Sequence, residues 1–176
     1  IESGANSGDR ARGLEIFDYD DDGDLDLFVS RRMALTSDTG ALPISNKLLR
    51  NEGDSGFVDV TVDVGLDAKG FWEGAAWGDW DGDGDVDLLV GQRDGAFHFY
   101  ERIRDGSLAE RIGDGNPFAG LRVDGYSAPT AVDWDGDGDL DIVAGGYNGT
   151  ISFFERVEDG RFVVRTGEAN PFRGID

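Results

Sequence analysis

The sequence lacks cysteine altogether and contains only one histidine and one methionine. Without cysteine, the fold can have neither a disulfide nor a thiolate metal site. With His98 as the lone imidazole and no thiol, few nucleophile–base pairs can be assembled for covalent catalysis. No apolar run approaches the length needed to cross a bilayer. These absences argue against a disulfide-stapled domain, a thiol enzyme and insertion into a membrane.

Basic residues are also scarce. Lys and Arg total 16 against 37 Asp and Glu, which gives a formal net charge of −21. Nucleic acids and anionic lipid surfaces are recognised by basic patches, so we expect neither as a partner. An excess of carboxylates favours cations as ligands instead.

Glycine is abundant, with 28 residues in the 176-residue chain, and no segment shows a convincing helical period. Frequent glycines permit tight turns and close backbone approaches. The composition therefore predicts many short strands rather than long helices.

A nine-residue acidic segment occurs three times, at residues 18–26, 79–87 and 133–141. The second and third copies begin 54 residues apart, and the sequences that follow them align without a gap at this offset. Residues 111–120 thus correspond to residues 165–174, and each contains Asn-Pro-Phe. This period is close to that of propeller blades, and it divides the chain into units of approximately 1–66, 67–120 and 121–176.

Each unit contains the pattern of four antiparallel strands. In the second and third units the first strands are expected at residues 74–80 and 128–134, before the acidic loop. The second strands follow the loop, and Asp-Gly at 94–95 and Asn-Gly at 148–149 predict hairpins, the latter with a type I′ turn. Third strands are expected at 97–100 and 151–154, and fourth strands at 108–112 and 162–166. We predict an all-β fold of three four-stranded β-propeller blades, part of a larger or assembled propeller.

The first unit differs by an insertion at about residues 33–45, in which residues 35–43 read as a loop by composition. Its later strands are expected at residues 46–51 and 57–62.

The acidic segments have the spacing of a cation-binding loop. Asp at positions 1, 3 and 5 with Gly at position 6 wraps oxygen ligands around a hard cation, position 7 gives a backbone carbonyl, and position 9 completes the shell. Position 12 is Val29, Val90 or Ala144, which excludes an EF-hand because that loop needs a bidentate Glu there. We predict three Ca2+ sites. The side-chain ligands expected are Asp18, Asp20, Asp22 and Asp26, then Asp79, Asp81, Asp83 and Asp87, then Asp133, Asp135, Asp137 and Asp141, and the carbonyl ligands are those of Asp24, Asp85 and Asp139.

These loops resemble those of the FG-GAP (or VCBS) repeat family, which includes the propeller of integrin α subunits. In that family an Asp-x-Asp-x-Asp-Gly-x-x-Asp loop joins the first two strands of each blade and holds calcium. Residues 74–78 stand close to the place of the family's Phe-Gly, and residues 46–53 are similar to blades of large secreted FG-GAP proteins. The resemblance implies an extracellular or cell-surface location, structural calcium, and adhesion or ligand binding.

We therefore expect a non-enzymatic calcium-binding adhesion or scaffold module. The alternatives are a carbohydrate-binding propeller and a non-catalytic segment of a larger secreted enzyme. Three blades are fewer than a closed propeller needs, so further blades or head-to-tail self-association are expected as partners, with glycans as an alternative.

Some residues outside the loops have both a functional and a structural interpretation. His98 and the Asn148 sequon are interpreted as structural, the latter as a turn, and Phe118 and Phe172 of the Asn-Pro-Phe segments as packing between blades. Six large aromatic residues could stack on sugars, but core packing is the favoured interpretation. They are Trp72, Trp77, Trp80, Trp134, Tyr126 and Tyr147.

Overall fold

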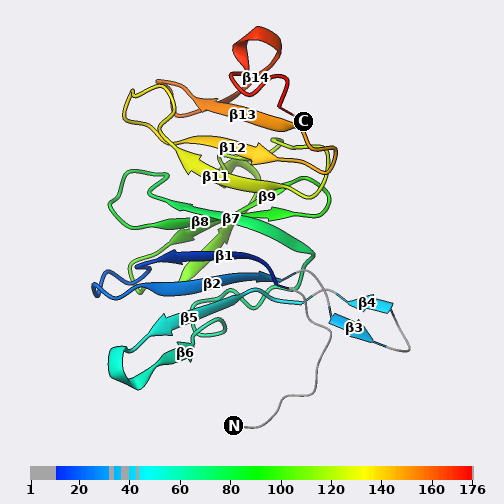
Figure 1. The fold of residues 1–176 in the computed structure, drawn as a ribbon. Coiled ribbons are helices and arrows are strands. Elements are labelled where there is room, and N and C mark those ends of the chain that lie inside the picture. The colour runs from blue at the N-terminus through cyan, green and yellow to red at the C-terminus, as the bar shows by residue number, and fades with distance from the viewer. Residues whose placement is uncertain (1–10, 32–33, 37–39, 43, 176) are drawn as a thin grey trace. The chain divides into compact units, whose positions relative to one another are not determined.

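The computed structural model describes residues 11–31, 34–36, 40–42 and 44–175. Its main elements are three four-stranded antiparallel sheets, which confirms the predicted all-β fold (Figure 1). Within the described ranges the only helices are three short 3-10 turns, η1 (Gly53–Ser55), η2 (Gly113–Gly115) and η3 (Gly167–Ala169). None of these is long or apolar enough to cross a membrane.

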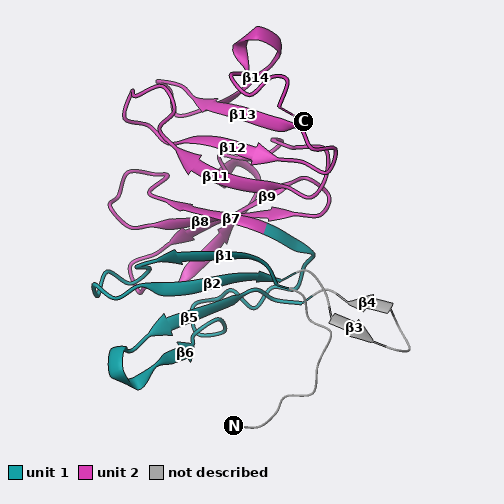
Figure 2. Cartoon of the chain, viewed as in Figure 1, with its two compact units in different colours: residues 1–73 teal, residues 74–176 magenta. Residues whose placement is uncertain are grey.

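The chain divides into two compact units, residues 1–73 and residues 74–176 (Figure 2). Unit 1 contains one sheet, here called blade 1, with the strand order β1 (Ala11–Phe17), β2 (Asp26–Arg31), β5 (Lys47–Asn51) and β6 (Phe57–Asp59). Side chains of β2 alternate between buried and half-buried, and Phe28 and Leu48 are fully enclosed. The period of two thus places one face of the sheet against the core.

The insertion in unit 1 corrects one prediction. Strands β3 (Ala34–Thr36) and β4 (Gly40–Leu42) pair as a two-stranded antiparallel ribbon where a loop was expected. Backbone groups of an insertion need hydrogen-bond partners, and a local strand pair supplies them without help from the main sheet. The other residues expected in that loop, 37–39 and 43, lie outside the described part of the chain.

Unit 2 contains two sheets in simple sequential order. Blade 2 comprises β7 (Trp72–Gly78, whose first two residues belong to unit 1), β8 (Asp87–Gln92), β9 (Phe97–Arg102) and β10 (Leu108–Arg111). Blade 3 comprises β11 (Ala128–Val132), β12 (Asp141–Gly145), β13 (Ile151–Arg156) and β14 (Phe162–Arg165). Their shared core includes Trp80, Phe99 and Phe118 of blade 2 and Ile142 and Phe154 of blade 3. As expected, Phe118 of the first Asn-Pro-Phe segment is buried between blades.

The predicted hairpins between second and third strands are confirmed, but the turn at Asn148 is not the type I′ turn that was expected. Gly95 N donates to Gln92 O at 2.9 Å, and Gln92 N donates to Ala96 O at 3.1 Å. Gly95 has φ +90°, whereas Asp94 is not among the residues with positive φ. This is a type I turn closed by a glycine bulge, and residues 146–150 repeat it. The Asp94 carboxylate accepts the Ala96 N–H at 3.0 Å, a local bond available with only the glycine left-handed.

Candidate metal centres

Each acidic loop joins the first and second strands of its blade and is curled around its first aspartate. In the second loop, Asp79 Oδ1 accepts the Gly82 N–H at 2.7 Å, and Asp79 Oδ2 accepts the Gly84 N–H at 3.1 Å. The third loop repeats both bonds from Asp133, to Gly136 and Gly138. The loop amides have no partner on a neighbouring strand. The carboxylate at position 1 accepts their N–H groups instead and holds the loop in a tight turn.

Positions 3 and 5 are oriented by the next backbone amides along the loop. Asp81 Oδ1 accepts the Asp83 N–H at 3.1 Å, and Asp83 Oδ1 accepts the Asp85 N–H at 2.9 Å. Each bond engages one carboxylate oxygen, Oδ1, and each carboxylate has two oxygens that can act as acceptors or ligands. Alternate side chains along the loop are thereby turned toward one centre.

Three groups of carboxylates lie close enough to share a cation, with one ligand atom from each member within 4.8 Å of the others. The structure therefore brings together part of each predicted ligand set. Among the described residues, position 9 joins a group only in the second loop, and the side chains of Asp24, Asp85 and Asp139 join none. The three groups are Asp18, Asp20 and Asp22; Asp79, Asp81 and Asp87; and Asp133, Asp135 and Asp137.

The aspartate at position 9 has a second task that the sequence pattern did not indicate. Asp87 is fully buried, and it accepts the Trp80 N–H at 3.1 Å and the Arg102 N–H at 2.9 Å. Its carboxylate thus joins position 2 of the loop to the end of the third strand. Asp141 makes the same pair of bonds to Trp134 and Arg156.

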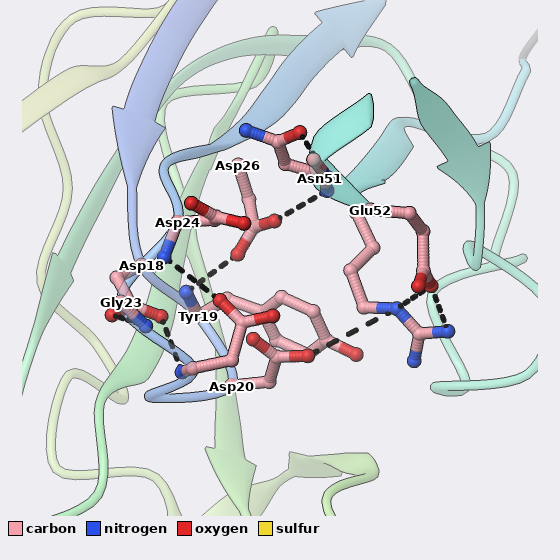
Figure 3. Close-up of polar contacts among 11 residues, drawn as sticks. Asp18, Tyr19, Asp20, Gly23, Asp24, Asp26, Asn51 and Glu52 are labelled. Atoms are coloured by element: carbon pink, nitrogen blue, oxygen red, sulfur yellow. Dashed lines mark hydrogen bonds and ion pairs between the residues drawn. The ribbon is translucent and has the colours of Figure 1, made fainter. Parts of the chain in front are cut away.

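The first loop shows this tether clearly, with the Asp26 carboxylate between the backbones of Tyr19 and Asn51 (Figure 3). The two distances are 2.9 Å from Tyr19 N and 2.7 Å from Asn51 N. Arg102 and Arg156 end matching segments one repeat apart, but each donates through its backbone amide, so the tether leaves no side-chain signature in the sequence.

The first loop also contains a buried carboxylate oxygen that tests the fit of a metal ion. Asp20 Oδ1 is buried and has no hydrogen-bond partner. Arg50 Nε lies 3.9 Å from the other oxygen, Asp20 Oδ2. A buried carboxylate oxygen without a partner is costly. A bound cation beside Asp18 and Asp22 would satisfy it, so the residues present fit a metal ion.

Burial and crowding disfavour the charged forms of several loop carboxylates. Burial raises the pKa of Asp20, and the neighbouring Asp22 and Asp26 raise it further. Burial likewise raises the pKa of Asp81, and it raises the pKa of Asp87 to about 7. A divalent cation would offset this penalty by supplying opposite charge where the carboxylates converge.

The other singled-out residues differ in their burial and contacts. Trp72 and Trp80 are buried, in agreement with core packing, whereas Trp134 and Tyr147 are exposed. His98 Nδ1 lies 2.8 Å from Glu110 Oε1 on the surface of blade 2. Asn148 Oδ1 accepts the N–H and the hydroxyl of Thr150, as a turn residue does.

The spacing of the loops matches a known family. The model of the FG-GAP-like repeat matches residues 18–90 and residues 80–144, and each match runs from one acidic loop through the next. The chain belongs to the FG-GAP-like repeat family. No curated protein matches it in sequence. FG-GAP repeats form propeller-like modules, and the three blade-like sheets agree with this architecture. Such repeats are typical of extracellular proteins.

Proposed function

We propose that this FG-GAP module is a non-enzymatic extracellular scaffold or adhesion unit that is held rigid by three calcium ions. The observation that carries the proposal is the buried, unpartnered Oδ1 of Asp20, in a loop whose acidic pattern occurs three times. A solvated acidic turn has no reason to bury such an oxygen.

Calcium fits the donor set better than other common ions. The loops offer carboxylates and carbonyls but no imidazole or thiolate, which disfavours zinc and copper. Calcium accepts six to eight oxygen ligands in flexible geometry, whereas magnesium requires a strict octahedron. The first loop contains one glycine and the second and third loops contain two each, which gives them the flexibility that calcium tolerates.

The tether at position 9 explains how an ion would stiffen a blade. In the second loop Asp87 belongs to the metal-capable group and also holds the Arg102 N–H at the end of β9. An ion held by Asp79, Asp81 and Asp87 would therefore link the loop between β7 and β8 to the third strand. This is a structural role, since the carboxylates are committed to the loop and its ion.

Carbohydrate binding is the second candidate, and one observation favours it. Tyr147 is 73% exposed and lies against Tyr126, with ring centroids 4.9 Å apart. Tyr126 has φ +50°, an uncommon conformation for an aromatic residue, and Arg93 lies 5.7 Å from its ring centroid. The face of an exposed aromatic ring suits a sugar ring. Binding on a glycan array that is lost in Tyr147→Ala would support this candidate.

Isothermal titration calorimetry on the chelator-stripped chain tests the calcium proposal. We expect about three calcium ions per chain. Asp83→Ala should remove or strongly weaken one site, whereas Asp85→Ala is a matched control that keeps the backbone carbonyl and should retain all three. Magnesium should bind more weakly. Absence of calcium binding, or retention of all three sites in Asp83→Ala, would overturn the proposed coordination.

A further inference from the structure

Unit 2 contains two of the acidic loops, and one side chain connects them. Leu140 occupies position 8 of the third loop, between Asp139, whose carbonyl is an expected ligand, and Asp141, whose carboxylate tethers the loop to β13. Leu140 is half-buried and packs against the hydrophobic core that includes Trp80. It therefore reaches out of its own loop toward position 2 of the second loop.

The contact is made over Gly78, the last residue of β7. A Cβ placed on Gly78 would lie 2.5 Å from Leu140 Cδ1 and 3.4 Å from Cε2 of the Trp80 indole ring. The leucine methyl group and the indole thus share the space around one glycine. Phe162 of β14 contacts the same indole, with ring centroids 6.0 Å apart. Blade 3 therefore holds Trp80 at two points, and Trp80 is only 3% exposed.

Trp80 is in turn attached to every member of the metal-capable group of the second loop. It lies between Asp79 and Asp81 in the chain, and its N–H is accepted by Asp87 at 3.1 Å. These three aspartates place one ligand atom each within 4.8 Å of the others. Since Trp80 joins two of them covalently and the third by a hydrogen bond, the packing of its indole ring helps to set where the three carboxylates meet.

The blades on either side of this contact are locked together through their backbones. Ser127, just before β11, accepts the Gln92 N–H on its Oγ at 2.7 Å and donates that hydroxyl to Ala96 O at 2.8 Å. A Cβ placed on Gly91 would lie 1.9 Å from Ser127 O, so the two chain segments are in direct contact. The loops, rather than the blades, are therefore the parts that respond to an ion, and close packing transmits the response.

We propose that the second and third loops bind calcium with positive cooperativity and that Leu140 couples them. The inference rests on the proposed calcium function. A third loop that is ordered around an ion holds Leu140 against Gly78 and Trp80, so less conformational entropy is lost when the second loop is ordered in its turn. By thermodynamic linkage, the second loop must strengthen binding in the third by the same factor.

Electrostatics alone predicts the opposite sign. Two bound cations repel each other, and an empty acidic loop attracts a cation to its neighbour, so charge effects would make the two sites anticooperative. The sign of the coupling therefore separates packing from charge.

Calcium titration followed by heteronuclear NMR tests the proposal on the 176-residue chain, because it resolves each loop. Position 6 is glycine in all three loops, and the amide signals of Gly23, Gly84 and Gly138 report the occupancy of the first, second and third loop. The measured quantity is the calcium dissociation constant of one loop with the ligand set of another loop intact or disabled.

Conservative amide substitutions disable one loop at a time. Asp135→Asn removes a ligand charge from the third loop but keeps the Oδ1 that accepts the Asp137 N–H at 3.2 Å. Asp81→Asn is the reciprocal change, because Asp81 Oδ1 accepts the Asp83 N–H. Glu158→Gln is the charge control, since Glu158 is an exposed residue of the turn between β13 and β14 and belongs to none of the three metal-capable groups found among the described residues.

We expect Asp135→Asn to weaken calcium binding in the second loop by about fivefold, and Asp81→Asn to weaken binding in the third loop by the same factor. Glu158→Gln should leave the second loop unchanged.

The same pair of measurements in a Leu140→Ala background tests the coupling residue. There, adding Asp135→Asn should change the dissociation constant of the second loop by less than about twofold. A loss of stability caused by Leu140→Ala is common to both members of the pair and cancels in their ratio. Leu140→Met, which refills the space with a similar volume, should restore the coupling. If Leu140→Ala does not fold, as judged by circular dichroism, Gly78→Ala replaces it, because the added Cβ displaces Leu140 Cδ1.

Three results would overturn the proposal: equal or tighter calcium binding in the second loop of Asp135→Asn, weakening in one direction only, or coupling that persists in Leu140→Ala. Each of these leaves the calcium sites themselves in place. Absence of any calcium response at Gly84 and Gly138 would instead refute the proposed function, and the coupling with it.

Discussion

The first and second acidic loops follow the same carboxylate spacing but close in different ways. In the second loop Gly82 at position 4 has φ +81°, and its N–H is held by Asp79 Oδ1 at 2.7 Å. In the first loop Asp21 takes that position with φ +60°, and Asp18 Oδ1 instead accepts the Asp22 N–H at 3.2 Å. The ligand spacing is thus compatible with two backbone closures.

The two loops differ in backbone strain at position 4 and in the burial of an unpartnered carboxylate oxygen. The second loop meets the left-handed backbone with glycine, which has no Cβ to strain. The first loop places an aspartate there and also leaves Asp20 Oδ1 buried without a partner. We therefore expect the first loop to depend most on a bound cation.

Removal of calcium should produce the largest effect. At a calcium concentration 1,000 times the dissociation constant, each site stabilises the folded state by about 4 kcal/mol through mass action. The melting temperature, followed by calorimetry, should fall strongly when a chelator is added. In hydrogen exchange the first loop should lose more protection than the second. An unchanged melting temperature would refute structural calcium, and equal losses in both loops would remove the distinction between them.

Loss of the tether at position 9 should come next. Asp87→Ala leaves the Trp80 and Arg102 N–H groups without their acceptor, which should destabilise the calcium-free chain by about 2 kcal/mol. Urea unfolding in chelator measures this loss, and Asp85→Ala, a half-buried neighbour, should change stability by less than about 0.5 kcal/mol. Asp26→Ala should match Asp87→Ala, because the tether is common to both loops. A much smaller loss for Asp26→Ala would show that the first loop is held differently.

The pH dependence of stability should change sign with calcium. Burial raises the folded-state pKa of Asp87 from 3.8 to about 7, so its stabilising contribution is complete below pH 4 and is lost as the pH rises through about 7. The pKa of Asp20 is also raised by burial. The calcium-free chain should therefore melt at a higher temperature at pH 5 than at pH 8. With limiting calcium the order should reverse, because protons compete with the ion for the same oxygens.

The fourth position of the loops should show the smallest effect. Asp21→Gly should stabilise the calcium-free chain by up to about 1 kcal/mol, because glycine relieves the left-handed strain. Gly82→Asp should cost a similar amount, and no atom lies within 4 Å of a Cβ at Gly82 to add a steric term. Urea unfolding of the two variants measures both changes. Two changes of the same sign would show that backbone strain does not separate the loops.

The strands and the metal-capable groups were largely predictable because they depend on local patterns. Alternating apolar residues and turn glycines placed the strands of blades 2 and 3 to within about two residues, and the aspartate spacing indicated which side chains would gather. The turn type at Asn148 was missed, because Asn-Gly can close either a type I′ turn, with both residues at positive φ, or a type I turn in which only the following glycine is left-handed.

The sequence by itself determined that this chain is a repeat of acidic loops between short strands, since a carboxylate at every second position and a glycine at the turn are local requirements. Only the tertiary structure decided which of the equivalent residues in the repeats are buried under a neighbouring blade. Trp80 and Trp134 occupy the same place in their repeats, yet one is enclosed by a neighbouring blade and the other is half exposed. The reason is physical: burial belongs to a pair of surfaces, and a repeated sequence specifies each surface without specifying what lies against it.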